Sequence, residues 1–301
     1  MKETKRAAEA TAMSGAQHAA ALSCGMTPRH EPAMPCATGT DEKPVPMRGS
    51  FVRALRAEAL KSKHAAPLRL AIVLALPFPL LAVLGALLAP QAGLTYAPWN
   101  YWYALLMPVA ITLAAASVAR ADARLGNRAL LSSGVPLRQA WGAKVVWCLI
   151  LSALSNLVVF AVYAAASIAV PQGAASMPAM LAAALALIVA SSWMVPTTLF
   201  LTMRAGMLAG VFVPLAVQIA LAFSWSVVPF WPACPPSATI MLPTAFLPVL
   251  PSGEPVGVGM DIVETVSQGD AIALALGIAC ALTAVLVVAG ASWFEKSEER
   301  R

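Results

Sequence analysis

Six stretches of the chain contain no Asp, Glu, Lys, Arg or His, and each has enough residues to cross a membrane as a helix. They run from Leu70 to Ala89, Tyr101 to Ala119, Val145 to Val170, Met180 to Met203, Ala205 to Val228 and Ala271 to Phe294. Only Arg204 separates the fourth from the fifth. One helix over both would be roughly 70 Å long, more than twice a hydrocarbon core of about 30 Å. The pattern therefore predicts a chain reversal at residues 204–206 and an all-α integral membrane protein with six transmembrane helices.

Composition and charge add an orientation to this picture. Hydrophobic residues make up 59% of the chain and charged residues 11%, against roughly 25% charged in soluble domains. Of the 20 Lys and Arg residues, eleven precede the first span, five lie between the second and third, one between the fourth and fifth, and three follow the sixth. All therefore fall on one side of the predicted bundle, which the positive-inside bias makes cytoplasmic. We predict a multi-pass protein of the bacterial inner membrane with both termini cytoplasmic, and no nucleic-acid partner.

The chain before the first span divides into an unpatterned tail and an amphipathic segment. Residues 1–49 mix small and polar residues without apolar periodicity, which predicts disorder; a true start of translation at Met47 is a second interpretation. Residues 50–67 predict a cytoplasmic helix in the membrane interface, or alternatively a solvated basic segment. The apolar face of that helix would be formed by Phe51, Val52, Leu55 and Ala59. Residues 68–301 then form the six-span domain.

The segment between the fifth and sixth spans is apolar yet rich in proline. Eight prolines lie between Pro229 and Pro255, which excludes one continuous helix, and residues 240–250 are too apolar for a solvated loop. We therefore predict a re-entrant or interfacial segment on the extracytoplasmic side, packed against the mouth of the bundle. Nearby aromatic side chains would form an outer vestibule or, alternatively, an ordinary aromatic belt; they are Trp99, Trp102, Trp225 and Trp231.

The predicted spans carry no charged side chain, which disfavours proton-coupled transport and ion pumping. The sequence also lacks the G-x-x-x-x-G-K-[ST] phosphate loop, the H-E-x-x-H zinc pair and the G-x-S-x-G elbow, so we expect neither catalysis nor a metal site in this chain. Asn156 and Gln218 are expected to hydrogen-bond between helices or, alternatively, to line a substrate route. Gly206 and Gly210 form a small-xxx-small ridge that favours close helix packing.

Four short segments stand out within this layout: RALRAEALKSK at Arg53 to Lys63, WNYWY at Trp99 to Tyr103, GVPLRQAWGAK at Gly134 to Lys144 and WFEK at Trp293 to Lys296. Together with the layout, they resemble the permease subunits of ABC-2 type transporters, and among them the lantibiotic (bacteriocin) immunity permeases. The resemblance in layout covers residues 50–301.

This resemblance implies a dimer with a second permease chain, identical or different, and a separate ATP-binding subunit that holds ATP and Mg. No cofactor is then expected in this chain. The candidate contacts with the ATPase are Glu58, Lys61, Arg138 and Lys144. The implied substrate is a hydrophobic or amphipathic peptide, expelled for self-immunity. Export of a drug, lipid or polysaccharide, and a non-transporting membrane anchor or scaffold, are the alternatives.

Overall fold

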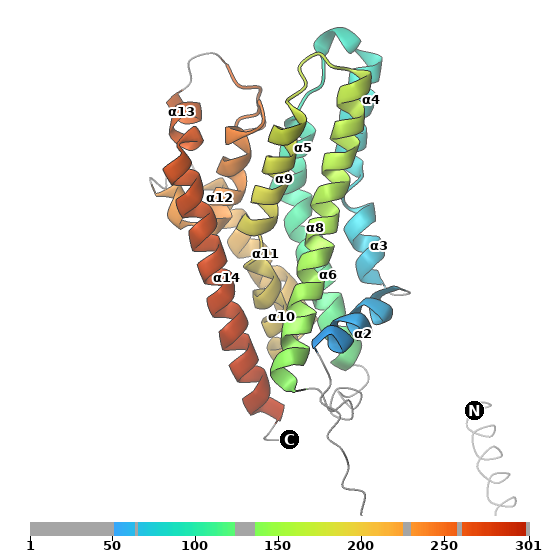
Figure 1. The fold of residues 1–301 in the computed structure, drawn as a ribbon, viewed down its shortest axis with the longest axis vertical. Helices are drawn as coiled ribbons and strands as arrows, with labels where there is room; N and C mark the ends of the chain where they lie inside the picture. Colours follow the sequence, from blue (N-terminus) through green and yellow to red (C-terminus); the bar gives the residue numbers. More distant parts are fainter. Residues whose placement is uncertain (1–50, 64–65, 124–135, 225–229, 258–260, 299–301) are drawn as a thin grey trace, which may run out of the picture. The chain divides into compact units, whose positions relative to one another are not determined.

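The structure, a computed structural model, describes residues 51–63, 66–123, 136–224, 230–257 and 261–298. Within these ranges the long elements are all helices, and they form a bundle (Figure 1). The one β-bridge of the described residues joins Val249 to Pro255. The tail of residues 1–49 lies outside the described part, so its predicted disorder stays a prediction. Across the described residues, which are mostly helical, the all-α fold is confirmed.

Each predicted span corresponds to one helix or to consecutive helices. In chain order these are α3 (Ala66–Val73) with α4 (Pro77–Leu88), α5 (Ala97–Tyr101) with η2 (Trp102–Leu106) and α6 (Met107–Ala123), α8 (Leu137–Ala169), α9 (Met177–Ala190) with α10 (Met194–Ala205), α11 (Met207–Phe223) and α14 (Gly269–Glu298). Five of these six segments, all but α11, are long and apolar enough to cross a membrane. These five segments support a multi-pass architecture. A sixth span stays a prediction, because α11 has only 17 residues.

Several spans are interrupted next to prolines, which lack the backbone N–H of a helical hydrogen bond. The break between α3 and α4 ends at Pro77, the first residue of α4. The break between α9 and α10 lies at residues 191–193, shortly before Pro196. The π-helical turn η2 immediately precedes Met107 and Pro108. These spans are therefore helices with local breaks at defined positions.

The predicted reversal between the fourth and fifth spans is confirmed. The helix α10 ends at Ala205, Gly206 has a φ of +93°, and α11 begins at Met207. A positive φ suits glycine, which has no Cβ to clash with the backbone. One turn further on, Gly210 faces Thr202 so closely that an added Cβ would lie 2.8 Å from the Thr202 backbone nitrogen. Gly210 therefore allows α10 and α11 to approach closely, whereas Gly206 lies in the turn.

The segment before α14 folds onto the bundle as short helices. They are η3 (Trp231–Ala233), α12 (Pro235–Met241), η4 (Leu242–Ala245) and α13 (Asp261–Ser267). Every residue of α12 is buried, and α12 packs against α9, α11 and α14. Asn100 holds the turn that follows, because its amide donates to the carbonyl oxygens of Leu250 (3.1 Å) and Pro251 (3.2 Å). The segment thus packs on the bundle, while its re-entry into a membrane stays a prediction.

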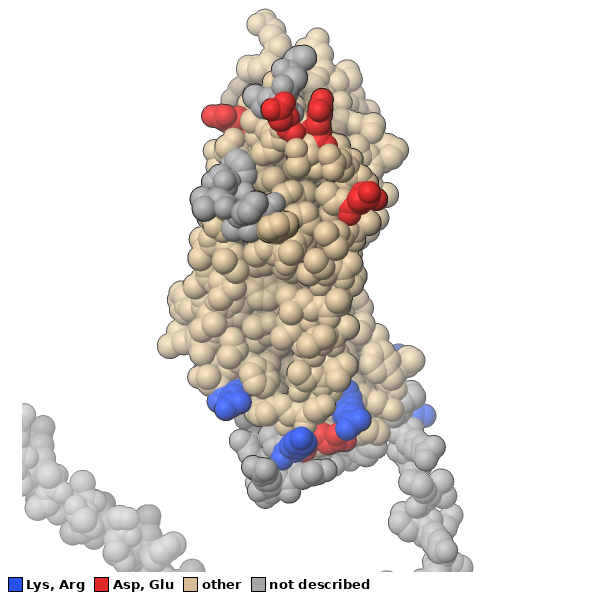
Figure 2. All heavy atoms as spheres, turned by 90° about the vertical axis from the view of Figure 1, so that its left-hand side faces the viewer, with Lys and Arg blue, Asp and Glu red and all other residues tan. Residues whose placement is uncertain are grey.

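Charged side chains separate toward the two ends of the described bundle. Lys and Arg gather at the end where α2 (Phe51–Lys63) and the carboxyl end of α14 lie, and a broad middle zone of the face in Figure 2 carries no charge. The acidic residues at the opposite end belong to the segment before α14 and to its first turn; they are Glu254, Asp261, Glu264 and Asp270. We call the end that holds α2 and the carboxyl end of α14 the basic end. Its cytoplasmic location stays a prediction.

An alkaline phosphatase reporter, which is active only outside the cytoplasm, tests this orientation. We expect no phosphatase activity when the reporter follows Arg301, and high activity when it is inserted at residues 258–260, because basic segments are retained in the cytoplasm. A fluorescent reporter that matures only in the cytoplasm should give the reverse pattern at the same two positions. Phosphatase activity after Arg301 would contradict the predicted topology.

Gly210→Ala tests the contact between α10 and α11. The added methyl group would overlap the Thr202 hydroxyl, and overpacking of this kind costs about 1–3 kcal/mol. We expect a lower unfolding temperature for the detergent-solubilised protein. Gly277→Ala in α14 is the matched control, because its new methyl group meets nothing within 4 Å. Equal unfolding temperatures for the two variants would contradict the close approach.

Candidate functional site at the basic end

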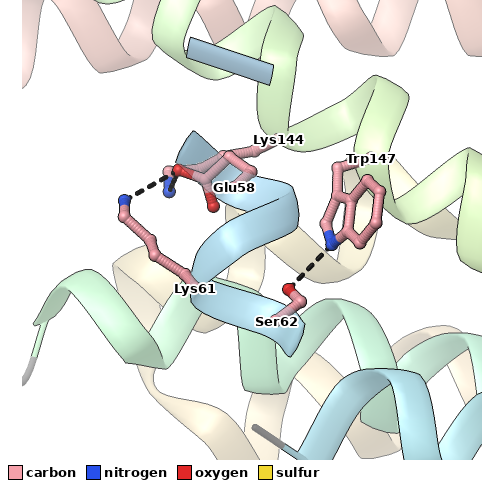
Figure 3. A network of polar contacts seen from close by, with 5 residues as sticks. All are labelled: Glu58, Lys61, Ser62, Lys144 and Trp147. Carbon is pink, nitrogen blue, oxygen red and sulfur yellow. Dashed lines mark hydrogen bonds and ion pairs between the residues drawn. The ribbon is translucent and has the colours of Figure 1, made fainter. Parts of the chain in front are cut away.

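A buried ion pair joins α2 to α8 at the basic end (Figure 3). The ammonium nitrogen of Lys144 lies 2.9 Å from Oε1 of Glu58, and Lys144 is 0% exposed while Glu58 is 5% exposed. Lys61, which is partly exposed, contacts the same oxygen at 2.9 Å. One carboxylate therefore serves two ammonium groups, one in the interior and one near the surface.

The spacing of polar residues on the two helices produces this contact. Glu58 and Ser62 are four residues apart on α2, and Lys144 and Trp147 are three apart on α8, so each pair shares one helix face. The indole N–H of Trp147 donates to Ser62 Oγ at 2.8 Å, beside the ion pair (Figure 3). The two helices are thus joined by matched polar side chains. We call this contact the α2–α8 tie.

The side of α2 that packs on α8 is not its predicted apolar face. Phe51 and Val52, expected on that face, are 37% and 70% exposed, which a face toward lipid would require, and Leu60 is 59% exposed. The face that packs on α8 instead carries the polar side chains of Glu58 and Ser62, because the buried Lys144 requires a charged partner there. The membrane-interface location of α2 stays a prediction.

A second set of contacts joins the start of α8 to the carboxyl half of α14. Trp141 is fully buried, and its indole N–H donates to the Val287 carbonyl oxygen at 3.0 Å. Its ring lies against Gly290, where even one added methyl group would overlap the indole. Arg138 Nε, which is exposed, pairs with Glu295 Oε2 at 2.6 Å. The first turns of α8 are therefore fixed on one side by α2 and on the other by α14.

The structure brings the four candidate coupling residues to these two sets of contacts. Glu58 and Lys144 pair with each other in the interior, so neither offers its side chain to a partner's surface; this corrects the expectation of direct contacts. Lys61 and Arg138 are exposed and could touch a partner. A role of the four in coupling stays a prediction.

The aromatic residues predicted to line an outer vestibule lie mostly in the core. Trp99 and Trp102 are 0% exposed and Trp231 is 5% exposed, while Trp225 lies outside the described residues. Trp99 packs on the Tyr163 ring with centroids 4.6 Å apart, and the Trp102 indole N–H donates to Asn156 Oδ1 at 3.4 Å. Within the described part, these tryptophans therefore fill the space between helices rather than lining an open surface.

Sequence reasoning missed Ser62, Trp141 and Trp147 as parts of the site. The i, i+4 spacing of Glu58 with Ser62 and the i, i+3 spacing of Lys144 with Trp147 were available signals. Their pairing was not, because nothing in the sequence specifies which face of α2 meets which face of α8. Among the described residues, no three His, Cys, Asp or Glu side chains lie close enough together to hold a metal ion.

Comparison of the sequence with protein-family models, with curated proteins and with solved structures found no match. The class that the described structure supports is a multi-pass membrane protein with helices tied together at its basic end.

Glu58→Gln tests the energetic weight of the α2–α8 tie. The substitution takes the carboxylate away from a buried ammonium group, and breaking a buried pair typically costs about 3–5 kcal/mol. We expect a large fall in unfolding temperature, and recovery in the double variant Glu58→Gln/Lys144→Met, because it removes the buried positive charge as well.

Arg138→Gln is the matched control, since its pair with Glu295 is largely exposed and such pairs contribute about 0–1 kcal/mol. Its unfolding temperature should stay close to that of the parent protein. A Glu58→Gln variant as stable as Arg138→Gln would show that the tie contributes nothing to folding.

Proposed function

We propose that this chain is the membrane-spanning permease subunit of an ATP-driven exporter in the bacterial inner membrane. It would act with a second permease chain and with a separate subunit that binds ATP and Mg and docks at the basic end. The substrate would be a hydrophobic or amphipathic peptide, and its expulsion would provide immunity to a lantibiotic or another bacteriocin.

The observation that carries this proposal is the α2–α8 tie. A partner that pushes on α2 or on the first turn of α8 would move both helices together. Separating them would leave the buried ammonium group of Lys144 without the carboxylate of Glu58, which is costly. The start of α8 is also fixed to α14 through Trp141. Force applied at the basic end would therefore reach helices of 33 and 30 residues, which extend to the opposite end.

The charge pattern favours the same interpretation. A soluble partner that docks at the basic end would meet exposed cations, among them Lys61 and Arg138, and a complementary acidic surface would steer its association. The predicted spans carry no charged side chain, which suits an apolar or amphipathic substrate better than an ion, because ions in hydrocarbon need charged or polar partners.

The full-length chain, isolated in mild detergent from the cells that make it, should bring with it an ATP-binding subunit. After reconstitution into vesicles, we expect ATP hydrolysis that depends on this chain and rises when a lantibiotic is added. The Glu58→Gln/Lys144→Met variant should keep the ATPase bound. Its stimulation of ATP hydrolysis by the lantibiotic should be about fivefold weaker than that of the parent protein, or weaker still, in line with ordinary coupling energies. Arg56→Gln, which removes a charge from α2 outside the tie, should keep the stimulation.

Each alternative gives a different result in the same assay. Stimulation by a drug, lipid or polysaccharide but by no lantibiotic would contradict the peptide substrate. A bound partner without ATP hydrolysis would contradict the permease and favour an anchor or scaffold. Deletion of the chain should raise sensitivity to at least one bacteriocin in a panel, and unchanged sensitivity would count against immunity.

A further inference from the structure

A pocket opens at the basic end, where the carboxyl end of α6 meets the reversal between α10 and α11. Its volume is about 580 Å³, and its walls include Ala119 and Arg120 of α6, Thr202 and Ala205 of α10, and Gly206 and Met207 at the reversal. This volume falls in the range of pockets that hold small ligands, about 300–1,000 Å³. The pocket lies at the carboxyl ends of two segments that are long and apolar enough to cross a membrane, Ala97–Ala121 and Met177–Ala205, where lipid headgroups would lie if these segments span it.

The first donor at this pocket is the guanidinium group of Arg120. It is exposed, and one of its nitrogens donates to the Met207 sulfur at 3.2 Å. A thioether is a weak acceptor, so this contact positions the guanidinium without neutralising its charge. A phosphate oxygen would be a far stronger partner, because guanidinium and phosphate form charge-assisted and often bidentate hydrogen bonds.

The second group of donors is the amino end of α11, which forms part of the pocket wall. The first backbone N–H groups of a helix have no partner within the helix, and the positive end of the helix dipole lies there. Gly206 stands at the N-cap position without a side chain to accept from them, and the first turn of α11 holds no acidic residue. An anion bound here would meet these amides and Arg120 together.

A third observation comes from Thr202, on the opposite wall. The residue is 8% exposed, and its hydroxyl has no hydrogen-bond partner among the described residues. The hydroxyl faces α11 at Gly210, one turn into that helix. Thr202 also lines the pocket, so a bound phosphate would supply the missing acceptor once this side chain turns from Gly210 toward the pocket.

The surface next to the pocket is apolar. Leu208 is 75% exposed and Phe212 is 61% exposed, and their spacing of four residues places them on one face of α11. Inorganic phosphate would make no favourable contact with this apolar surface, whereas the acyl chains of a lipid would cover it. We therefore propose that the pocket binds the phosphate of an anionic phospholipid, with Arg120 and the first-turn amides of α11 as donors and with the acyl chains along Leu208 and Phe212.

The test follows the unfolding temperature of the full-length protein in detergent during titration with phosphatidylglycerol, phosphatidylcholine or inorganic phosphate. We expect saturable stabilisation by phosphatidylglycerol and little by the other two. Arg120→Gln should raise the half-saturating concentration of phosphatidylglycerol about tenfold, as the loss of one charged hydrogen bond does. Arg120→Lys keeps the charge but loses the bidentate geometry, so its half-saturating concentration should lie between those of the parent protein and of Arg120→Gln.

Arg56→Gln is the control, since Arg56 is an exposed cation of α2 and does not line this pocket. An equal effect of Arg56→Gln and Arg120→Gln would overturn the site in favour of diffuse charge attraction. Equal stabilisation by phosphatidylcholine would overturn the preference for an anionic lipid, and saturation by inorganic phosphate alone would overturn the lipid as occupant. The titration involves neither an ATPase nor a transport substrate, so its result is independent of the proposed function.

Discussion

The hydrocarbon core of a membrane offers no partner for a charge or for a backbone hydrogen bond, and the organisation of the described bundle follows from that constraint. Its long elements are helices, which satisfy their own backbone groups, and their polar side chains mostly bond within the same helix. Ser155 donates to the carbonyl oxygen of Leu151, and Thr283 to that of Ala279, each four residues earlier. Charged side chains are left to the two ends, where water and headgroups can solvate them (Figure 2).

The Glu58–Lys144 pair shows what the same constraint demands where a charge does enter the protein interior. A buried ammonium group requires a carboxylate and further polar neighbours, so a helix that supplies one becomes fixed in position. This is why the side of α2 that meets the bundle is polar while Val52 and Leu60 stay exposed. The basic end is therefore cross-linked by three contacts between helices: Glu58 with Lys144, Ser62 with Trp147, and Trp141 with Val287.

Some interior polar groups elsewhere join neighbouring helices. Gln218 donates to Thr239 Oγ1 at 2.6 Å, which links α11 to the buried helix α12. Ser192 and Thr283 share a hydrogen bond of 2.6 Å between the break after α9 and the middle of α14. The interpretation of Asn156 and Gln218 as packing residues agrees with their burial and partners. The break at residues 191–193 is thus held in place by a neighbouring helix.

The sequence alone determined the apolar segments, the reversal at Gly206 and the separation of charge, because these depend on local properties: span length, glycine's tolerance of positive φ, and the cost of charge in hydrocarbon. The resemblance to ABC-2 permeases also made Glu58 and Lys144 candidates, but as surface contacts with an ATPase. Only the tertiary structure decided that they face each other in the interior, that Trp99 and Trp102 fill the core, and that Arg120 meets the start of α11. These outcomes depend on which helix faces meet, and a uniformly apolar helix carries too little periodicity for its sequence to specify that.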